Sequence, residues 1–140
     1  MADKRLMDIL NESIARELAA LVQYMWQHVM ASGLQSAEIE EIIKKVSIDE
    51  MKHAEKLAER LDYFGGIPTT KPSPIKVGGT VEEMLRDDVK AEEEAIQLYK
   101  RAIQLAQELG DPVTRLLYEE ILSQEEGHHH TFRTLLGDKA

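Results

Sequence analysis

Apolar residues recur every three or four positions along most of this chain, a spacing that predicts amphipathic helices rather than strands. Between residues 39 and 61 the inward-facing positions follow one another in steps of three and four, and three other segments show the same rhythm. The pattern predicts an all-α protein with helices over about residues 3–32, 36–64, 80–109 and 112–136.

The ends of these helices carry typical capping residues. Thr80, followed three residues later by Glu83, forms a capping box, and Asp111 before Pro112 is a strong helix start. Ser36 is expected to cap the second helix. Each helix is followed by a residue that adopts the left-handed conformation readily. These residues are Gly33, Gly65, Gly110 and Gly137.

The connections predict how the helices are ordered in space. The turns near residues 33–35 and 110–111 are short, so the first two and the last two helices should each form an antiparallel pair. About 15 extended residues span ~50 Å, and a helix of about 29 residues is ~43 Å long. The link at residues 65–79 can therefore run the whole length of the helices. We expect residues 1–140 to form one domain, a four-helix bundle with one long crossover between helices two and three.

Two pairs of polar residues interrupt the apolar stripes. Glu50 and His53 occupy two inward positions of the second predicted helix. Glu125 and His128 have the same spacing and occupy equivalent positions of the fourth. A lone Glu-x-x-His pair on a helix is a weak signal, but a position on the buried stripe makes each pair a candidate for metal binding.

A further glutamate precedes each pair by about one helix. Glu17 lies 33 residues before Glu50, and Glu94 lies 31 residues before Glu125. We place Glu17 and Glu94 on the inward stripes of their helices, and expect the acidic residues 92–93 to face solvent. The two halves of the chain then form a divergent repeat of one helical hairpin.

Four carboxylates and two imidazoles brought together by four helices form a set of metal ligands. Burying carboxylates costs several kcal/mol apiece without compensating charge, and two divalent cations would balance four of them. Oxygen-rich ligation with one imidazole per metal suits iron(II) or manganese(II) better than zinc or copper. The residues therefore predict a di-iron or di-manganese carboxylate site.

Composition narrows the class of protein further. The formal net charge of −9 argues against a nucleic-acid-binding face. No run of 18 apolar residues occurs, and the first residues lack the apolar centre of a signal peptide, so no membrane association is expected. Cysteine is absent, which excludes disulfides and thiolate metal sites and is consistent with a reducing cytoplasm. We expect a cytoplasmic protein.

Five segments spread over nearly the whole chain carry an ordered set of residues. They are Glu17-Leu18-x-Ala20-x-x-Gln23-Tyr24, Ser47-Ile48-Asp49-Glu50-Met51-Lys52-His53-Ala54-Glu55, Val81-Glu82-Glu83-Met84-Leu85, Glu94-Ala95-Ile96 and Ile121-Leu122-x-x-Glu125-Glu126-Gly127-His128. This set resembles the bacterioferritins, and the resemblance implies a ferritin-like four-helix bundle with a ferroxidase centre that holds two iron ions per chain. The ligands it implies are Glu17 and Glu94 as terminal carboxylates, Glu50 and Glu125 as bridging carboxylates, and His53 and His128 as one imidazole on each iron.

The same resemblance implies two more roles. Tyr24 matches a tyrosine beside the di-iron centre, and Met51 matches a methionine that binds haem b between two subunits, one sulfur from each. Members of the family generally continue into a short fifth helix that lines a symmetry axis of a 24-subunit shell, and the printed sequence ends at Ala140, soon after the fourth helix. We expect self-association as a dimer, with the shell as an open alternative.

The leading hypothesis is a ferroxidase that oxidises iron(II) with dioxygen or hydrogen peroxide, for iron storage or detoxification. A second hypothesis is a di-iron peroxidase resembling the rubrerythrins, or a manganese catalase, since manganese fits the same ligands. The absence of cysteine removes the rubredoxin domain of typical rubrerythrins. A third hypothesis is a non-catalytic haem-binding helical assembly.

Overall fold

The computed structural model describes residues 3–138, and this part of the chain contains four α-helices and no strand. The helices are α1 (Lys4–Met30), α2 (Ser36–Tyr63), α3 (Val81–Glu108) and α4 (Pro112–Leu136). The all-α class and the existence of all four helices are as the sequence predicted, and the observed bounds differ from the predicted ones by at most two residues.

Local capping explains where most of the helices begin. Thr80 and Glu83 form the expected capping box, with both hydrogen bonds at 3.1 Å. The side chain of Asp111 accepts a hydrogen bond from the backbone N–H of Thr114, and a proline occupies the first position of α4. Ser36 was expected to cap α2, but it is the first residue of the helix, and Gln35 occupies the cap position.

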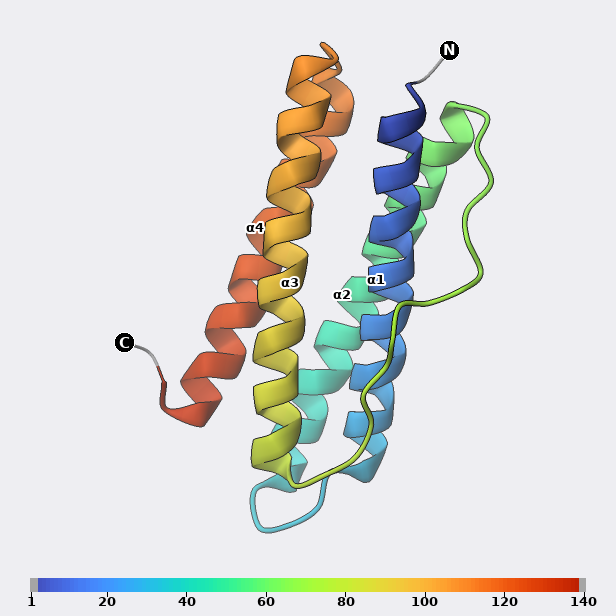
Figure 1. The fold of residues 1–140 in the computed structure, drawn as a ribbon. Coiled ribbons are helices and arrows are strands. Elements are labelled where there is room, and N and C mark those ends of the chain that lie inside the picture. Colours follow the sequence, from blue (N-terminus) through green and yellow to red (C-terminus); the bar gives the residue numbers. More distant parts are fainter. Residues whose placement is uncertain (1–2, 139–140) are drawn as a thin grey trace.

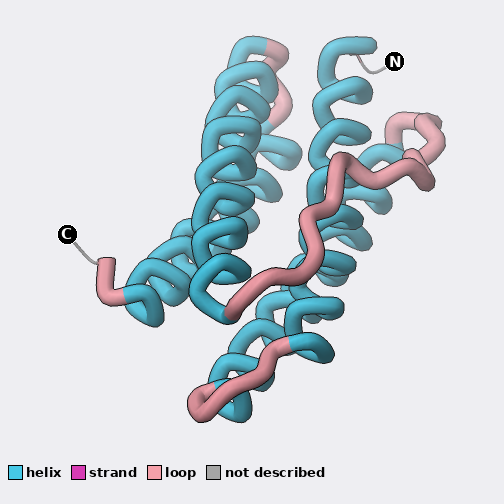
Figure 2. The backbone as a smooth tube through the Cα atoms, turned by 60° about the horizontal axis from the view of Figure 1, so that its bottom comes forward, coloured by secondary structure: helices cyan, strands magenta, loops and turns pink. Residues whose placement is uncertain are grey.

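The helices form two antiparallel hairpins, α1 with α2 and α3 with α4, that pack against each other (Figure 1). The connection at residues 64–80 runs along the bundle from the end of α2 to the start of α3, as the pink segment in Figure 2 shows. As a result α3 is parallel to α2, which is the topology predicted from the length of the link.

Polar contacts hold this crossover against α1. Asn11 donates a hydrogen bond to the carbonyl of Ile67 at 3.1 Å and accepts one from the N–H of Thr69 at 2.8 Å. Further along, the N–H of Ser73 donates to the carbonyl of Ala15 at 3.0 Å. The crossover thus covers one flank of α1, including the turn that carries Arg16 and Glu17.

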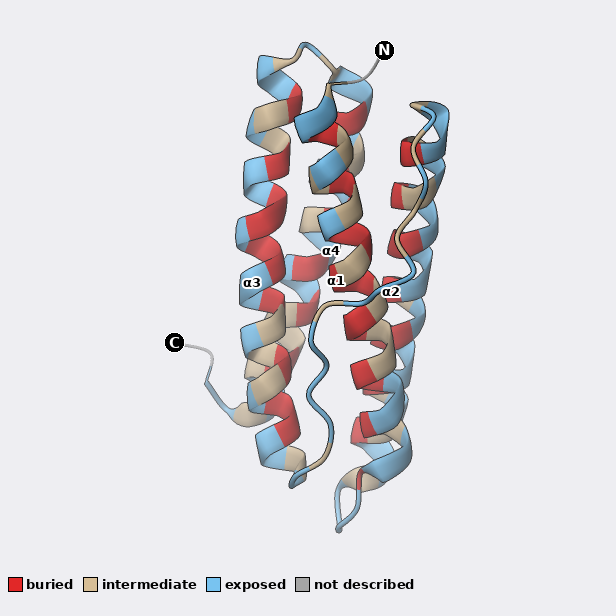
Figure 3. Ribbon diagram, turned by 45° about the vertical axis from the view of Figure 1, so that its right-hand side comes forward, coloured by how far each residue is buried: buried red, intermediate tan, exposed pale blue. Residues whose placement is uncertain are grey.

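Buried residues face the centre of the bundle from all four helices (Figure 3). They form two apolar clusters, one around Leu10, Leu57 and Tyr118 and the other around Tyr24, Ile43 and Phe132. On each helix the residues of one cluster precede those of the other, and a buried polar layer lies between them in the chain. None of the four described helices is both long and apolar enough to cross a membrane.

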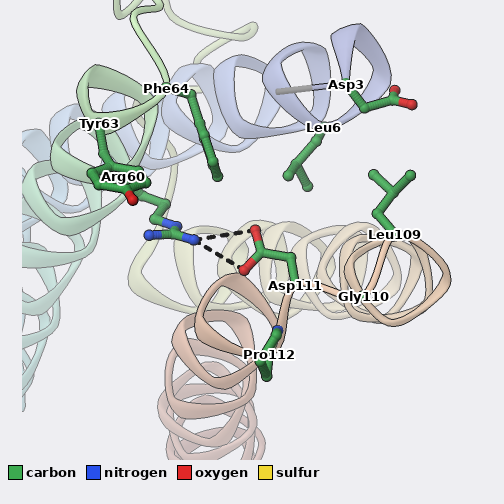
Figure 4. Close-up of a pocket in the computed structure, with 9 residues that line it drawn as sticks. All are labelled: Asp3, Leu6, Arg60, Tyr63, Phe64, Leu109, Gly110, Asp111 and Pro112. Atoms are coloured by element: carbon green, nitrogen blue, oxygen red, sulfur yellow. Dashed lines mark hydrogen bonds and ion pairs between the residues drawn. The ribbon is translucent and has the colours of Figure 1, made fainter. Parts of the chain in front are cut away.

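Polar contacts of Arg60 join the two hairpins at one end of the bundle (Figure 4). The Arg60 guanidinium donates to both oxygens of Asp111, at 2.9 and 3.2 Å, and to the hydroxyl of Thr114 at 2.8 Å. It also lies over the rings of Tyr63 and Phe64, 4.9 and 4.6 Å from their centres. These contacts border a cavity of about 430 Å³ and tie the end of α2 to the start of α4.

Asp88 is a buried acidic residue on α3. Its Oδ1 accepts a hydrogen bond from Gln23 at 3.0 Å, whereas its Oδ2 has no hydrogen-bond partner among the described residues. Burial raises the pKa of Asp88 to about 8, against the opposing effect of hydrogen bonds from Gln23 and Gln27. The carboxyl group is therefore protonated at neutral pH in the folded protein.

Replacing Asp88 with Asn should remove a pH dependence of stability. The unfolded chain loses this proton near pH 4 and the folded protein keeps it up to about pH 8, so wild-type stability should fall across that window by up to ~1.4 kcal/mol per pH unit. Asp88→Asn should gain stability relative to wild type as pH rises to 8, measured by urea denaturation. The exposed Asp62→Asn is the control, and a difference curve for Asp88→Asn as flat as the control's would contradict the assignment.

Candidate metal centre

The polar layer between the two apolar clusters is built from all four helices. Its members are Glu17 from α1, Glu50 and His53 from α2, Glu92 from α3, and Glu125 and His128 from α4. The four glutamates are fully buried and both histidines are nearly so. Five of these six residues are those that the sequence placed on the inward stripes.

The layer contains two overlapping groups of ligand atoms, each with its members within 4.8 Å of one another. The first consists of Glu17, Glu50, His53 and Glu125, and the second of Glu50, Glu92, Glu125 and His128. Glu50 and Glu125 belong to both groups. Each group offers three carboxylates and one imidazole, so the arrangement suits two neighbouring cations that share two carboxylates.

The two imidazoles present the same nitrogen to the layer. His53 Nδ1 lies 3.1 Å from Glu50 Oε1, and His128 Nδ1 lies 2.9 Å from Glu125 Oε1. The outer nitrogens are held from behind, since His53 Nε2 lies 2.6 Å from Gln124 Oε1 and His128 Nε2 lies 3.0 Å from Asp49 Oδ2. Such contacts fix the orientation of a metal-binding imidazole.

Two tyrosines support the outer glutamates in a reciprocal way. Tyr24 on α1 donates its hydroxyl hydrogen bond to Glu92 on α3 at 2.6 Å. Tyr99 on α3 donates to Glu17 on α1 at 2.8 Å. Tyr24 therefore lies beside the layer, where the resemblance placed it. Tyr99 was not identified from the sequence, although it follows Glu92 by seven residues as Tyr24 follows Glu17.

The expectation that Glu94 faces inward is wrong. Glu94 is exposed on α3, whereas Glu92, which was expected to face solvent, is fully buried in the layer. Successive residues of a helix point about 100° apart, so an error of two residues turns a side chain to the opposite face. The run of three acidic residues at 92–94 left this phase ambiguous.

Two signals in the sequence favour Glu92. The spacing from Glu92 to Glu125 is 33 residues, identical to that from Glu17 to Glu50. The buried face of α3 also keeps a regular spacing through this residue. Its members include Leu85, Asp88, Glu92, Ala95, Tyr99 and Ala102.

The two hairpins repeat the layer at an offset of 75 residues. The repeated pairs are Glu17 and Glu92, Tyr24 and Tyr99, Asp49 and Gln124, Glu50 and Glu125, and His53 and His128. The layer is thus a nearly two-fold arrangement built by one chain, with a single substitution, of Gln124 for Asp49, among these pairs.

Arg16 was not identified from the sequence, although it lies at the centre of the layer. Its Nη1 donates to Glu17 Oε2 at 2.9 Å and also contacts Glu50 and Glu125, while its Nη2 donates to Glu92 Oε2 at 3.1 Å. One guanidinium therefore touches all four carboxylates. Arginine is seldom buried unless it is paired with acidic groups. The sequence alone does not show such pairing across helices, so an arginine at this position would be expected to face solvent.

Charge in the layer is balanced by protons and by Arg16. Burial raises the pKa of Glu17 to about 7 and that of Glu125 well above its usual range. Burial also acts on Glu50, but Arg16 and the two imidazoles outweigh it and hold the pKa of this carboxyl well below its usual range. For His53, hydrogen bonds to Glu17 and Glu50 overcome burial and raise its pKa to about 10. Cations entering the layer would therefore displace protons.

The residues present fit a pair of divalent metal ions. Glu92 Oε1 is buried without a hydrogen-bond partner among the described residues, as expected for an atom placed to bind an ion. Both inner imidazole nitrogens and the shared carboxylates converge on the same small volume. Met51, by contrast, is 53% exposed on α2 and lies outside the layer.

Comparison with known proteins gives a consistent result. Residues 7–140 match the model of the ferritin-like domain. Bacterioferritin from Desulfovibrio desulfuricans is 36% identical over 125 residues, which are 89% of this chain and 70% of that protein. Bacterioferritin from Brucella melitensis is 33% identical over 135 residues, 96% of this chain and 84% of that protein.

Solved structures agree with the sequence matches. The D. desulfuricans bacterioferritin structure, described with its diiron site in different catalytic states, has a TM-score of 0.90 at 33% identity and covers 95% of this chain and 78% of its own. Rhodobacter capsulatus bacterioferritin, described with a metal-free dinuclear site and haem iron in a crystallographic special position, also has a TM-score of 0.90, at 30% identity, covering 97% and 86%.

The assignment of Glu92 in place of Glu94 can be tested by counting metal ions. Glu92→Gln should reduce tightly bound Zn²⁺, used as a redox-inert probe, from two ions per chain to one, because affinity at the altered position should fall by more than the ~10–100-fold typical of outer-shell changes. Glu94→Gln should keep two ions per chain. Isothermal titration calorimetry on metal-free protein gives both stoichiometries, and loss of one ion from Glu94→Gln alone would reverse the assignment.

Proposed function

Because the chain belongs to the bacterioferritin family, we propose that it binds two iron(II) ions in the polar layer and oxidises them, for iron storage or detoxification. The observation that carries this proposal is the pair of buried ligand groups that share Glu50 and Glu125. Glu17 and His53 complete one position, and Glu92 and His128 complete the other.

The electron balance of the proposed reaction is simple. Each iron(II) gives up one electron, and the pair reduces dioxygen with two protons to hydrogen peroxide, or hydrogen peroxide with two protons to two waters. The protein holds both ions within reach of one oxidant molecule. The shared carboxylates hold the ions together, and the imidazoles, fixed from behind by Gln124 and Asp49, keep their inner nitrogens turned inward.

Removal of a shared carboxylate tests the proposed function. Glu50→Ala and Glu125→Ala should each slow iron(II) oxidation by more than the ~10–100-fold typical of outer-shell changes, because both metal positions lose a ligand. Stopped-flow absorbance after aerobic addition of two Fe²⁺ per chain measures the rate, with hydrogen peroxide as the oxidant in a parallel series. The exposed Glu126→Ala is the matched control. Wild-type rates in both Glu50→Ala and Glu125→Ala would refute the site.

Haem binding is a second proposed property, supported by the exposure of Met51. Ile48 and Met51 lie on one face of α2 and are 41% and 53% exposed, so the Met51 sulfur is available to a second copy of the chain. A haem iron in a crystallographic special position, described for the R. capsulatus protein, supports a group shared between two subunits. The protein would then self-associate at least as a dimer.

Met51→Leu should abolish haem binding without loss of the fold, because leucine preserves the apolar volume and removes the sulfur. Titration of metal-free protein with haem, followed by the Soret absorption, is the measurement. Met25→Leu is the control, because Met25 is also an exposed methionine but lies on α1. An unchanged Soret spectrum in Met51→Leu would exclude this residue as the ligand.

A further inference from the structure

Besides the pair Asp49 and Gln124, Arg16 also departs from the two-fold repeat of the polar layer. The residue 75 positions after Arg16 is Ala91, whose side chain is a single methyl group. Arg16 Nη2 donates a hydrogen bond to the carbonyl of Ala91 at 3.3 Å. The guanidinium from one hairpin therefore reaches the backbone at the equivalent position of the other, and the alanine leaves room for it.

The guanidinium competes for the oxygens that a metal ion would need. Its Nη1 contacts Glu17, Glu50 and Glu125, which are three of the four members of the first ligand group. Its Nη2 contacts Glu92, which belongs to the second. An arginine in this position and two divalent cations cannot all bind the same carboxylate oxygens at full strength.

We propose that Arg16 is an internal cation that holds the four carboxylates together in the metal-free protein, and that the entering metal ions displace it toward Glu94. The proposal rests on the proposed function in one respect, that the displacing ions bind in the polar layer. It adds a residue that sets how tightly they bind.

The structure provides a place for the displaced side chain. A cavity of about 60 Å³ lies beside Arg16 under the crossover, and Gln23, Pro74 and Glu94 also line it. Arg16 keeps 9% of its surface exposed, whereas the four glutamates it contacts have none. Glu94 is exposed and makes no ion pair with another described residue. Its carboxylate can therefore receive the guanidinium at the outer edge of the cavity.

Such an exchange couples stability to metal affinity. The metal-free protein gains stability from the four contacts of Arg16, and the incoming ions must replace all of them. Metal binding is therefore weaker than the six ligands alone would allow, because an ion shifts the equilibrium only by the difference between its contacts and those it displaces. Removing the guanidinium should strengthen metal binding and weaken the metal-free fold.

The first test measures Zn²⁺ affinity and thermal stability of the full chain. Arg16→Gln should bind Zn²⁺ about tenfold more tightly than wild type or better. Its metal-free Tm should fall by roughly 5 °C or more, because four buried carboxylates lose their cation. Arg16→Lys, which keeps a charge with a shorter reach, should be intermediate in both and guards against loss of the fold. Arg60→Gln, which breaks an ion pair remote from the layer, should lower Tm and leave Zn²⁺ affinity unchanged.

The second test concerns the destination of the side chain. Glu94→Gln should weaken Zn²⁺ binding about threefold in the wild-type background and have no effect in the Arg16→Gln background, with two ions bound per chain throughout. In nitrogen-15 NMR spectra, the guanidinium signals assigned by Arg16→Lys should move and exchange faster with water when Zn²⁺ is added. Additive effects of the two substitutions would contradict the role of Glu94.

The results separate this proposal from the proposed function. If Glu50→Ala and Glu125→Ala lose Zn²⁺ binding but Arg16→Gln and Arg16→Lys bind it as wild type or more weakly, the displacement of Arg16 is refuted and the metal site stands. If Glu50→Ala and Glu125→Ala bind Zn²⁺ as wild type, the metal site itself is wrong.

Discussion

The whole layer between the two apolar clusters depends on one electrostatic constraint, that four carboxylates buried inside a helical bundle must be met by positive charge. Ionised carboxylates transferred from water without partners would cost more than a domain's net stability. Within the layer this charge comes from the Arg16 guanidinium and the protonated His53 imidazole, and protons on part of the carboxylates lower the demand for it. Tyr24 and Tyr99 add neutral hydrogen bonds to two of the same carboxylates.

This constraint also explains which parts of the molecule the sequence could predict. The helices follow from spacing and caps, because these depend on residues near in sequence. Glu50 and Glu125 could be placed because each interrupts a stripe that is otherwise clearly apolar. Glu92 could not be placed with the same certainty, since α3 carries acidic residues on both faces and its buried stripe itself contains Asp88.

Arg16 and Tyr99 were missed for a different reason. Each acts through residues on another helix: Arg16 reaches Ala91 and Glu92 across the bundle, and Tyr99 reaches Glu17. Periodicity within one helix describes only which face a residue occupies. The comparison of the two halves at an offset of 75 residues would have paired Tyr24 with Tyr99 from sequence alone, but even this comparison would not have shown that Arg16 turns inward.

The two imidazoles have different hydrogen-bond partners, which bears on the proposed oxidation of iron. His128 is held by the carboxylate of Asp49, whereas His53 is held by the neutral amide of Gln124. A carboxylate partner makes an imidazole a stronger electron donor than an amide does. If two iron ions bind in the layer as proposed, the higher oxidation state would be favoured on the side of His128. Such a pair of ions would lose its electrons in a fixed order, because an amide stands behind one imidazole and a carboxylate behind the other.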